Sequence, residues 1–163
     1  MAKGSDRPDV EFVRGEIVAR AMPDLVHSGV QKRLIVIFSA LEDRHRVFAF
    51  PELRLQLAAD LFRVPDIAIF AGAPPSQLVP DRPPLCVVEI VSRDDRYTEL
   101  LQKLDEYHGW GVQHVWVVDP WLERLSIYDG SGLRQAAEVG LPGIDRRIGI
   151  AELIRGLKEA VAP

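Results

Sequence analysis

The sequence predicts one α/β domain in which helices flank a mixed β-sheet. Short runs rich in Val, Ile and Phe recur between Pro and Gly residues, as is typical of strands. Other stretches carry apolar residues at helical spacing, and one of them lies between two almost wholly apolar runs. A helix between two buried strands makes those strands parallel, whereas residues 46–50 and 52–58 follow each other closely enough to pair antiparallel around Pro51.

The elements follow in order behind a polar start. Residues 1–9 are expected to form a flexible tail and residues 10–163 a single domain, which is long enough for a sizeable core. A hairpin over 10–20 is expected to turn at Arg14-Gly15, because two short extended runs flank this pair. Strands are expected over residues 46–50, 52–58, 64–70, 85–92, 113–119, 123–129 and 133–139, and helices over 25–42, 96–108 and 150–161.

Polar residues and glycines set the helix boundaries. Asp24 precedes the apolar stripe of the first helix and is expected to cap its N-terminus. Asp94 and Asp95 are expected to do the same for the second helix. Gly109 and Gly111 are expected to end that second helix, because glycine readily leaves the helical conformation.

Composition excludes several classes of protein. The hydrophobic fraction of 47% and the charged fraction of 27% are those of an ordinary globular domain. No apolar stretch approaches the roughly 20 residues that span a bilayer, and the polar N-terminus lacks the apolar core of a signal peptide, so we expect a cytoplasmic protein without a membrane partner. The single cysteine, Cys86, excludes an internal disulfide. The net charge of −4 does not by itself indicate a nucleic-acid-binding protein.

Glu89 is the most informative residue of the chain. It lies within the apolar run LCVVEIVS, which predicts a buried strand. An ionised carboxylate is costly to bury, so a protein keeps one there only if it is paired, protonated or bound to a metal. Glu89 therefore requires a partner from elsewhere in the chain.

Asp66 is the expected second acid of the same site. Side chains alternate between the two faces of a strand, so Asp66 lies on one face of the run 64–70 and Glu89 on one face of the run 85–92. The two carboxylates converge if these strands are neighbours in the sheet. Two close carboxylates repel each other unless a cation lies between them, and hard divalent cations such as Mg²⁺ or Mn²⁺ take oxygen ligands. The backbone carbonyl of Ile90 supplies a candidate third ligand. Lys103, on the following helix, is the candidate cationic side chain.

Together these motifs resemble the PD-(D/E)XK nuclease superfamily, and more closely its Uma-type branch of bacterial restriction endonuclease domains. The resemblance covers roughly residues 10–155, and order and spacing carry it. Its motifs here are Pro65-Asp66, Glu89, Lys103 to Tyr107, Gly111-Val112 and Val118-Asp119-Pro120. One position departs from the superfamily, whose lysine follows two residues after the Glu. Val91 occupies that position, and the branch relocates the lysine to the helix, at Lys103.

The resemblance implies a restriction-endonuclease-like fold with an N-terminal hairpin and a Mg²⁺-dependent endonuclease that acts on DNA, with a homodimer expected. Asp66 and Glu89 would be catalytic and would hold the metal with the Ile90 carbonyl. Lys103 would position the attacking water or stabilise the transition state. Glu16, next to Gly15, would be a possible accessory acid, and Tyr107 a possible accessory residue on the helix.

The same residues have structural interpretations that the sequence leaves open. Asp66 follows a proline and would suit a turn. Glu89 would be stable in an ion pair with a buried arginine. Lys103 follows Glu99 by four residues, the favourable order for a surface pair on a helix. Tyr107 would suit packing at the edge of the apolar stripe.

The four histidines do not extend the predicted site. His27, His45, His108 and His114 lack a metal-ligand spacing such as HExxH. His27 begins the first long helix and could approach the site, but a solvated histidine is the expectation.

Two functions other than catalysis remain open at this stage. One is a catalytically inactive nucleic-acid-binding module that keeps the fold, because a fold does not fix a function. The other is a structural dimer in which Glu89 is simply salt-bridged. A divalent cation between Asp66 and Glu89 would favour the nuclease over both.

Overall fold

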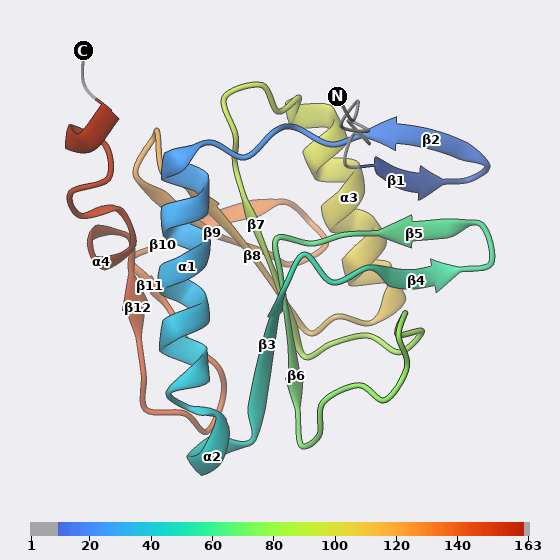
Figure 1. The fold of residues 1–163 in the computed structure, drawn as a ribbon, viewed down its shortest axis with the longest axis horizontal. Coiled ribbons are helices and arrows are strands. Elements are labelled where there is room, and N and C mark those ends of the chain that lie inside the picture. Colours follow the sequence, from blue (N-terminus) through green and yellow to red (C-terminus); the bar gives the residue numbers. More distant parts are fainter. Residues whose placement is uncertain (1–9, 162–163) are drawn as a thin grey trace, which may run out of the picture.

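A six-stranded mixed sheet forms the centre of the computed structural model, which describes residues 10–161. Its strands are β3 (Val47–Pro51), β6 (Ile67–Ala71), β7 (Cys86–Ile90), β8 (His114–Asp119), β9 (Arg124–Tyr128) and β10 (Leu133–Ala136). They lie in the order β10-β9-β8-β7-β6-β3 (Figure 1). Only β7 and β8 are parallel, and helix α3 (Tyr97–Trp110) joins them. The predicted mixed sheet with a helical crossover is therefore confirmed.

A second sheet extends from the first on the side where α3 lies. It has four strands in the order β2-β1-β5-β4, with bounds β1 (Val10–Val13), β2 (Glu16–Ala19), β4 (Leu55–Ala58) and β5 (Leu61–Arg63). The N-terminal hairpin is confirmed, and both residues of its turn, Arg14 and Gly15, have positive φ. A short pair, β11 (Glu138–Val139) and β12 (Ile148–Gly149), forms the third sheet.

The predicted hairpin around Pro51 is wrong. β3 pairs with β6, and β4 pairs with β5, a strand that the sequence did not predict. Glu52 adopts a positive φ of 50°, and the chain leaves the central sheet there. Pro51 has no N–H to donate and so suits the end of an edge strand.

The helices follow the predicted order with two changes in length. α1 (Leu25–Ser39) is separated by a turn from the short α2 (Glu42–His45), and the predicted final helix reduces to α4 (Ile150–Ile154) and a 3-10 turn, η1 (Glu159–Val161). α4 ends because Arg155 leaves the helical conformation and Gly156 has a positive φ of 72°. Asp24 caps α1, as predicted, by accepting the His27 N–H at 2.8 Å.

The N-terminus of α3 is not capped as the sequence predicted. Arg96 occupies the cap position and makes no side-chain cap bond. Asp95 Oδ2 accepts the Ser92 N–H instead, which stabilises the turn before the helix. At the other end Gly111, with a φ of 111°, ends the helix, whereas Gly109 lies within it.

Helices cover the central sheet on both faces. Val88 and Ile90 of β7 pack with α1 and α4 in the larger core. Val87, on the opposite face, packs with α3. Because side chains alternate along β7, Glu89 points toward α3 like Val87, whereas its neighbours Val88 and Ile90 point into the core under α1 and α4.

Two further sequence expectations concern burial and membranes. Cys86 is fully buried, as expected for a cysteine in the central strand. Between residues 10 and 161, no helix combines the length and the apolar character that crossing a bilayer requires. The predicted tail over residues 1–9 lies outside the described residues.

Packing of α1 on the sheet predicts a large difference between two positions of that helix. Leu34 is 1% exposed and Val36 is 60% exposed. Leu34→Ala should lower the free energy of unfolding by about 2–5 kcal/mol, because it removes buried contacts and leaves a cavity. The matched variant Val36→Ala should change it by less than about 0.5 kcal/mol. Urea denaturation measures both, and equal effects would contradict the assigned face of α1.

Candidate active site

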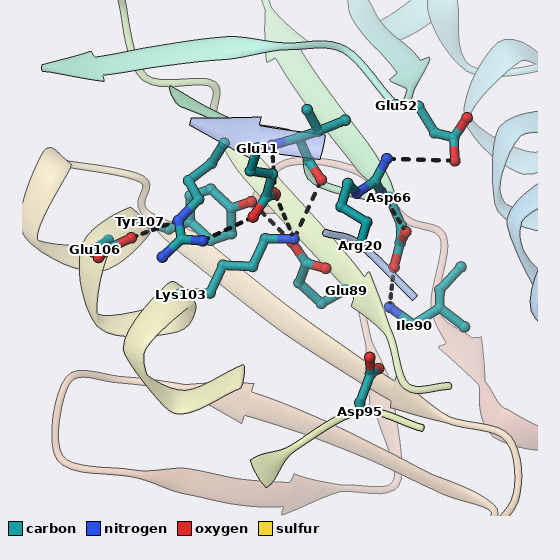
Figure 2. Close-up of polar contacts among 12 residues, drawn as sticks. Glu11, Arg20, Glu52, Asp66, Glu89, Ile90, Asp95, Lys103, Glu106 and Tyr107 are labelled. Carbon is teal, nitrogen blue, oxygen red and sulfur yellow. Dashed lines mark hydrogen bonds and ion pairs between the residues drawn. The ribbon is translucent and has the colours of Figure 1, made fainter. Parts of the chain in front are cut away.

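A cavity of about 520 Å³ opens between the ends of β6 and β7, the helix α3 and the hairpin β1–β2. Figure 2 shows the polar side chains that converge there. They come from both larger sheets and from both long helices. Six charged or titratable residues of this lining, Glu11, His27, Arg63, Asp66, Glu89 and Lys103, form the cluster described below.

Asp66 and Glu89 are brought to adjacent positions by the pairing of β6 with β7. These strands are antiparallel neighbours, and the register pairs Ile67 with Val88. The residue before Ile67, which is Asp66, therefore lies opposite Glu89. Asp66 Oδ2 accepts the Ile90 N–H at 2.6 Å, which links the two strand ends directly (Figure 2). This register makes Asp66 and Glu89 cross-strand neighbours.

Cations surround the other oxygen of Asp66. His27 Nε2 lies 3.1 Å from Asp66 Oδ1, and Arg20 Nη2 lies 3.4 Å from the same oxygen. Burial raises the pKa of Asp66, but the hydrogen bond and charge of His27, the charge of Lys103 and the hydrogen bond from the Ile90 N–H together outweigh it, so the pKa lies below the ordinary value. Asp66 is therefore an ionised carboxylate at neutral pH.

His27 is a buried member of the site, and the prediction of a solvated histidine is wrong. Only 5% of the residue is exposed, because it lies in the first turn of α1, against Asp66. Burial lowers its pKa, but the hydrogen bond to Asp66 and the charges of Asp66 and Glu89 raise it above the ordinary value. Its Nδ1 atom is buried without a hydrogen-bond partner among residues 10–161, so Asp66 alone orients the ring.

Glu89 is buried against α3 with two partners from that helix. Its Oε1 lies 3.0 Å from Lys103 Nζ and accepts the Tyr107 hydroxyl at 2.9 Å (Figure 2). The sequence left open an ion pair between Glu89 and a buried arginine, but the cationic partner in the structure is Lys103. Burial raises the pKa of Glu89, and with the charges of Asp66 and Glu11 it outweighs Lys103, so the pKa rises to about 7.

Lys103 is directed into the site, and the alternative that the sequence left open, a surface pair with Glu99, is not among the ion pairs of residues 10–161. Its ammonium lies 3.0 Å from an oxygen of Glu11, 3.0 Å from Glu89 Oε1 and 3.3 Å from the Val64 carbonyl. Burial lowers its pKa, but the charges of Glu89 and Glu11 raise it above the ordinary value. Three acceptors match the three N–H donors of an ammonium group, which remains charged.

Glu11 is the acid that sequence analysis missed. It is 5% exposed and accepts the Val64 N–H at 2.9 Å and Arg63 Nη1 at 2.7 Å, in addition to its contact with Lys103. Burial raises its pKa, but the charge of Lys103 and the two hydrogen bonds lower it below the ordinary value. The one available signal was the alternation in VEFV, which puts Glu11 on the face opposite the exposed Val10 and Phe12.

The two predicted accessory residues have different positions. Tyr107 is fully buried and hydrogen bonds Glu89, so it does more than pack at the edge of the helix. Glu16 is exposed on β2 and lines the cavity wall. Within residues 10–161 no ion pair involves Glu16. Tyr107 therefore contacts the cluster through Glu89, and Glu16 lies at the rim of the cavity.

The donor set suits a hard divalent cation that also binds substrate and water. No three His, Cys, Asp or Glu side chains of residues 10–161 converge closely enough to hold a metal by themselves. Mg²⁺ in phosphoryl-transfer sites commonly takes only one or two carboxylates, with the remaining ligands from water and phosphate. The Ile90 N–H faces Asp66, and in an antiparallel ladder the C=O of a residue is directed to the same neighbour as its N–H. Asp66, Glu89 and the Ile90 carbonyl therefore fit such an ion chemically.

Comparisons with known proteins agree with this fold. The profile of the Uma2 family, described as a putative restriction endonuclease, matches residues 3–157. A solved structure, that of a putative nuclease belonging to DUF820 from Anabaena variabilis ATCC 29413, superposes with a TM-score of 0.75 at 22% sequence identity. The match covers 90% of each chain. No curated protein matches the chain.

The raised pKa of Glu89 predicts how stability depends on pH. Its ordinary value is 4.5 and its folded value about 7, so the unfolded chain ionises first as pH rises. The stability that protonated Glu89 contributes is complete below pH 4.5 and is lost progressively up to about pH 7, by an amount on the order of 3 kcal/mol. Glu89→Gln removes this titration, so the variant should gain stability relative to the wild type between pH 4.5 and 7.

Urea denaturation at pH 4.5 and pH 8, with a chelator present, measures the difference. Glu99→Gln is the matched control, because the Glu99 side chain is 63% exposed. Its stability difference from the wild type should not change over this range. The assigned pKa of Glu89 would be contradicted if the free energies of unfolding of Glu89→Gln and the wild type differed by the same amount at both pH values.

Proposed function

The chain belongs to the Uma2 family, and from this premise we propose that it is a metal-dependent endonuclease that hydrolyses phosphodiester bonds in DNA. One observation carries the proposal. Two buried carboxylates, Asp66 and Glu89, which lie opposite each other at the ends of neighbouring strands, line the same cavity as the largely shielded ammonium of Lys103, whose side chain is 13% exposed. Buried charges of this kind, with strongly perturbed pKa values, are characteristic of functional sites.

Asp66, Glu89 and the backbone carbonyl of Ile90 would hold Mg²⁺ or Mn²⁺. Such an ion, when bound, polarises the phosphate and lowers the pKa of a water ligand. The low pKa of Asp66 keeps this carboxylate ionised and available as a ligand. Because the pKa of Glu89 is about 7, a metal ion that binds Glu89 competes with a proton as well as with Lys103.

Lys103 would act on the phosphate or the attacking water as a fixed positive charge. Its ammonium remains protonated, so it stabilises negative charge and donates hydrogen bonds but does not accept a proton. Tyr107 orients Glu89 through its hydroxyl, and His27 orients Asp66. In the reaction the attacking water loses a proton to solvent and its oxygen forms a bond to phosphorus, while the P–O bond to the leaving oxygen breaks and that oxygen takes up a proton from solvent, so the protons balance.

The charge of the cavity supports a cation between protein and DNA. Seven carboxylate side chains line the cavity, against four from Arg and Lys. A phosphate that approaches this lining without a cation is repelled, whereas a divalent ion on Asp66 and Glu89 reverses the local sign. Binding of the polyanion and binding of the metal are therefore expected to strengthen each other.

We further propose that the enzyme is cytoplasmic and homodimeric. The single buried cysteine suits a reducing compartment. Among residues 10–161 the strand β2 is at the edge of the four-stranded sheet, which makes it a candidate surface for strand pairing with a second copy. Analytical ultracentrifugation tests this assembly, and a monomer at micromolar concentration would contradict it.

A catalytically inactive module of the same fold is the second candidate. One observation favours this candidate: each buried carboxylate of the cluster already has a cationic side chain beside it, so the cluster needs no metal to balance its charge. His27 and Arg20 lie against Asp66, and Lys103 lies between Glu11 and Glu89. A protein that binds DNA with a steep salt dependence but does not bind Mn²⁺ would support this candidate.

Removing the charge of either proposed ligand should weaken metal binding. Asp66→Asn and Glu89→Gln keep the shape of the side chain but remove a charged oxygen ligand. Each should weaken Mn²⁺ binding, and each should lower the rate of DNA cleavage by more than about 100-fold, beyond the range typical of outer-shell partners. Isothermal titration calorimetry with Mn²⁺ and a nicking assay on supercoiled plasmid measure the two effects.

Asp94→Asn provides the control for these variants. Asp94 lines the same cavity but is exposed. Its substitution should leave Mn²⁺ affinity within about twofold, because an exposed charge is well screened. Wild-type affinity in both ligand variants, with the fold intact by circular dichroism, would reject Asp66 and Glu89 as metal ligands.

Lys103→Met should separate metal binding from catalysis. The substitution removes the ammonium that competes for Glu89 but keeps much of the apolar stem. We expect Mn²⁺ affinity no weaker than in the wild type and cleavage lowered by about 100- to 1,000-fold, as for the loss of one transition-state stabiliser. A variant that cleaves at the wild-type rate would remove Lys103 from the mechanism.

A further inference from the structure

The Lys103 ammonium is divided between two acids that come from different sheets. Glu89 is on β7 in the central sheet, beside Asp66, and Glu11 is on β1 in the four-stranded sheet. The two oxygens lie at the same distance, 3.0 Å, from Lys103 Nζ (Figure 2). Of these two acids, only Glu89 is a proposed metal ligand.

Glu11 is itself held rigidly. Both of its oxygens are used, since Oε1 accepts the Val64 N–H at 2.9 Å and Oε2 accepts Arg63 Nη1 at 2.7 Å. Arg63 is in turn fixed by Glu106, whose Oε2 accepts Arg63 Nε at 2.7 Å. Such a saturated carboxylate cannot rotate toward another ligand without losing buried hydrogen bonds, which is costly.

We propose that Glu11 is the positioning residue for Lys103: it holds the ammonium at the cavity and thereby leaves Glu89 free to bind the divalent cation. This inference rests on the proposed metal-dependent function and adds to it a residue and a role. Glu11 acts through Lys103 and not by ligating the metal.

Competition for Glu89 is the physical reason. A divalent ion at Glu89 and an ammonium 3.0 Å from the same carboxylate oxygen repel each other, and in a buried site this repulsion is only weakly screened. With Glu11 present, the ammonium keeps one full negative partner when the metal binds Glu89. Without the charge of Glu11, Lys103 has Glu89 as its remaining carboxylate partner at this distance, and the metal must displace it.

The experiment compares Glu11→Gln with Glu106→Gln. Glutamine at position 11 keeps the size and one of the two acceptor oxygens but not the charge. It should weaken Mn²⁺ affinity and lower kcat by roughly 10- to 100-fold each, the range for outer-shell partners of a metal site. Glu106 is the matched control, because it also pairs with buried Arg63 but makes no contact with Lys103 among the described ion pairs. Glutamine at position 106 keeps an oxygen that can accept the Arg63 Nε–H, so Arg63 and Glu11 should stay in place and both quantities should remain near the wild-type values.

A double-mutant cycle with Lys103→Met shows whether Glu11 acts through the lysine. In the Lys103→Met background, Glu11→Gln should have no further effect on Mn²⁺ affinity, because the competing ammonium is already gone. The same loss of affinity in both backgrounds would overturn the proposal in favour of Glu11 as a direct ligand. Equal losses in Glu11→Gln and Glu106→Gln would overturn it in favour of a structural role through Arg63.

Failure of this inference differs from failure of the proposed function. If the wild type binds Mn²⁺ and cleaves DNA while Glu11→Gln does the same, the positioning role alone is rejected. If the wild type neither binds Mn²⁺ nor cleaves DNA, the metal-dependent function is rejected and the role of Glu11 with it. Calorimetry on the wild type, measured first, separates these results, and thermal unfolding of each variant shows that it is folded.

Discussion

The buried ion pair network around Lys103 is the interaction on which the candidate site depends. Burying three carboxylates, Glu11, Asp66 and Glu89, in one cavity is costly unless cations balance them. Lys103 balances two of the three, and His27 with Arg20 balances the third. The positions of the acids are therefore set by the cations they contact, and the loss of one partner leaves a charge buried alone.

This network also explains why the fold brings two sheets and two helices to one place. The antiparallel pairing of β6 with β7 places Asp66 beside Glu89, and the crossover helix α3 carries Lys103 and Tyr107 over the same face. The four-stranded sheet adds Glu11 and Arg63 from the other side of the ammonium. Each element thus contributes charge that the others need, which couples folding of the small sheet to the electrostatics of the site.

The same contacts that stabilise the metal-free protein compete with a metal. His27 and Arg20 lie against Asp66, and Lys103 and a proton compete for Glu89. A divalent cation must therefore bring more than its attraction to two carboxylates, and substrate phosphate oxygens are the natural additional ligands.

The sequence alone indicated most strands of the central sheet, the parallel pair around α3 and the acids Asp66 and Glu89, because periodicity and the cost of a buried Glu89 are local properties. It also indicated the Asp24 cap and the N-terminal hairpin. Only the tertiary structure decided that β3 and β4 part at Pro51, that His27 is buried, and that Glu11 completes the site. Glu11 and Arg63 are 52 residues apart, and a contact over that distance depends on how sheets pack and not on the pattern of either strand.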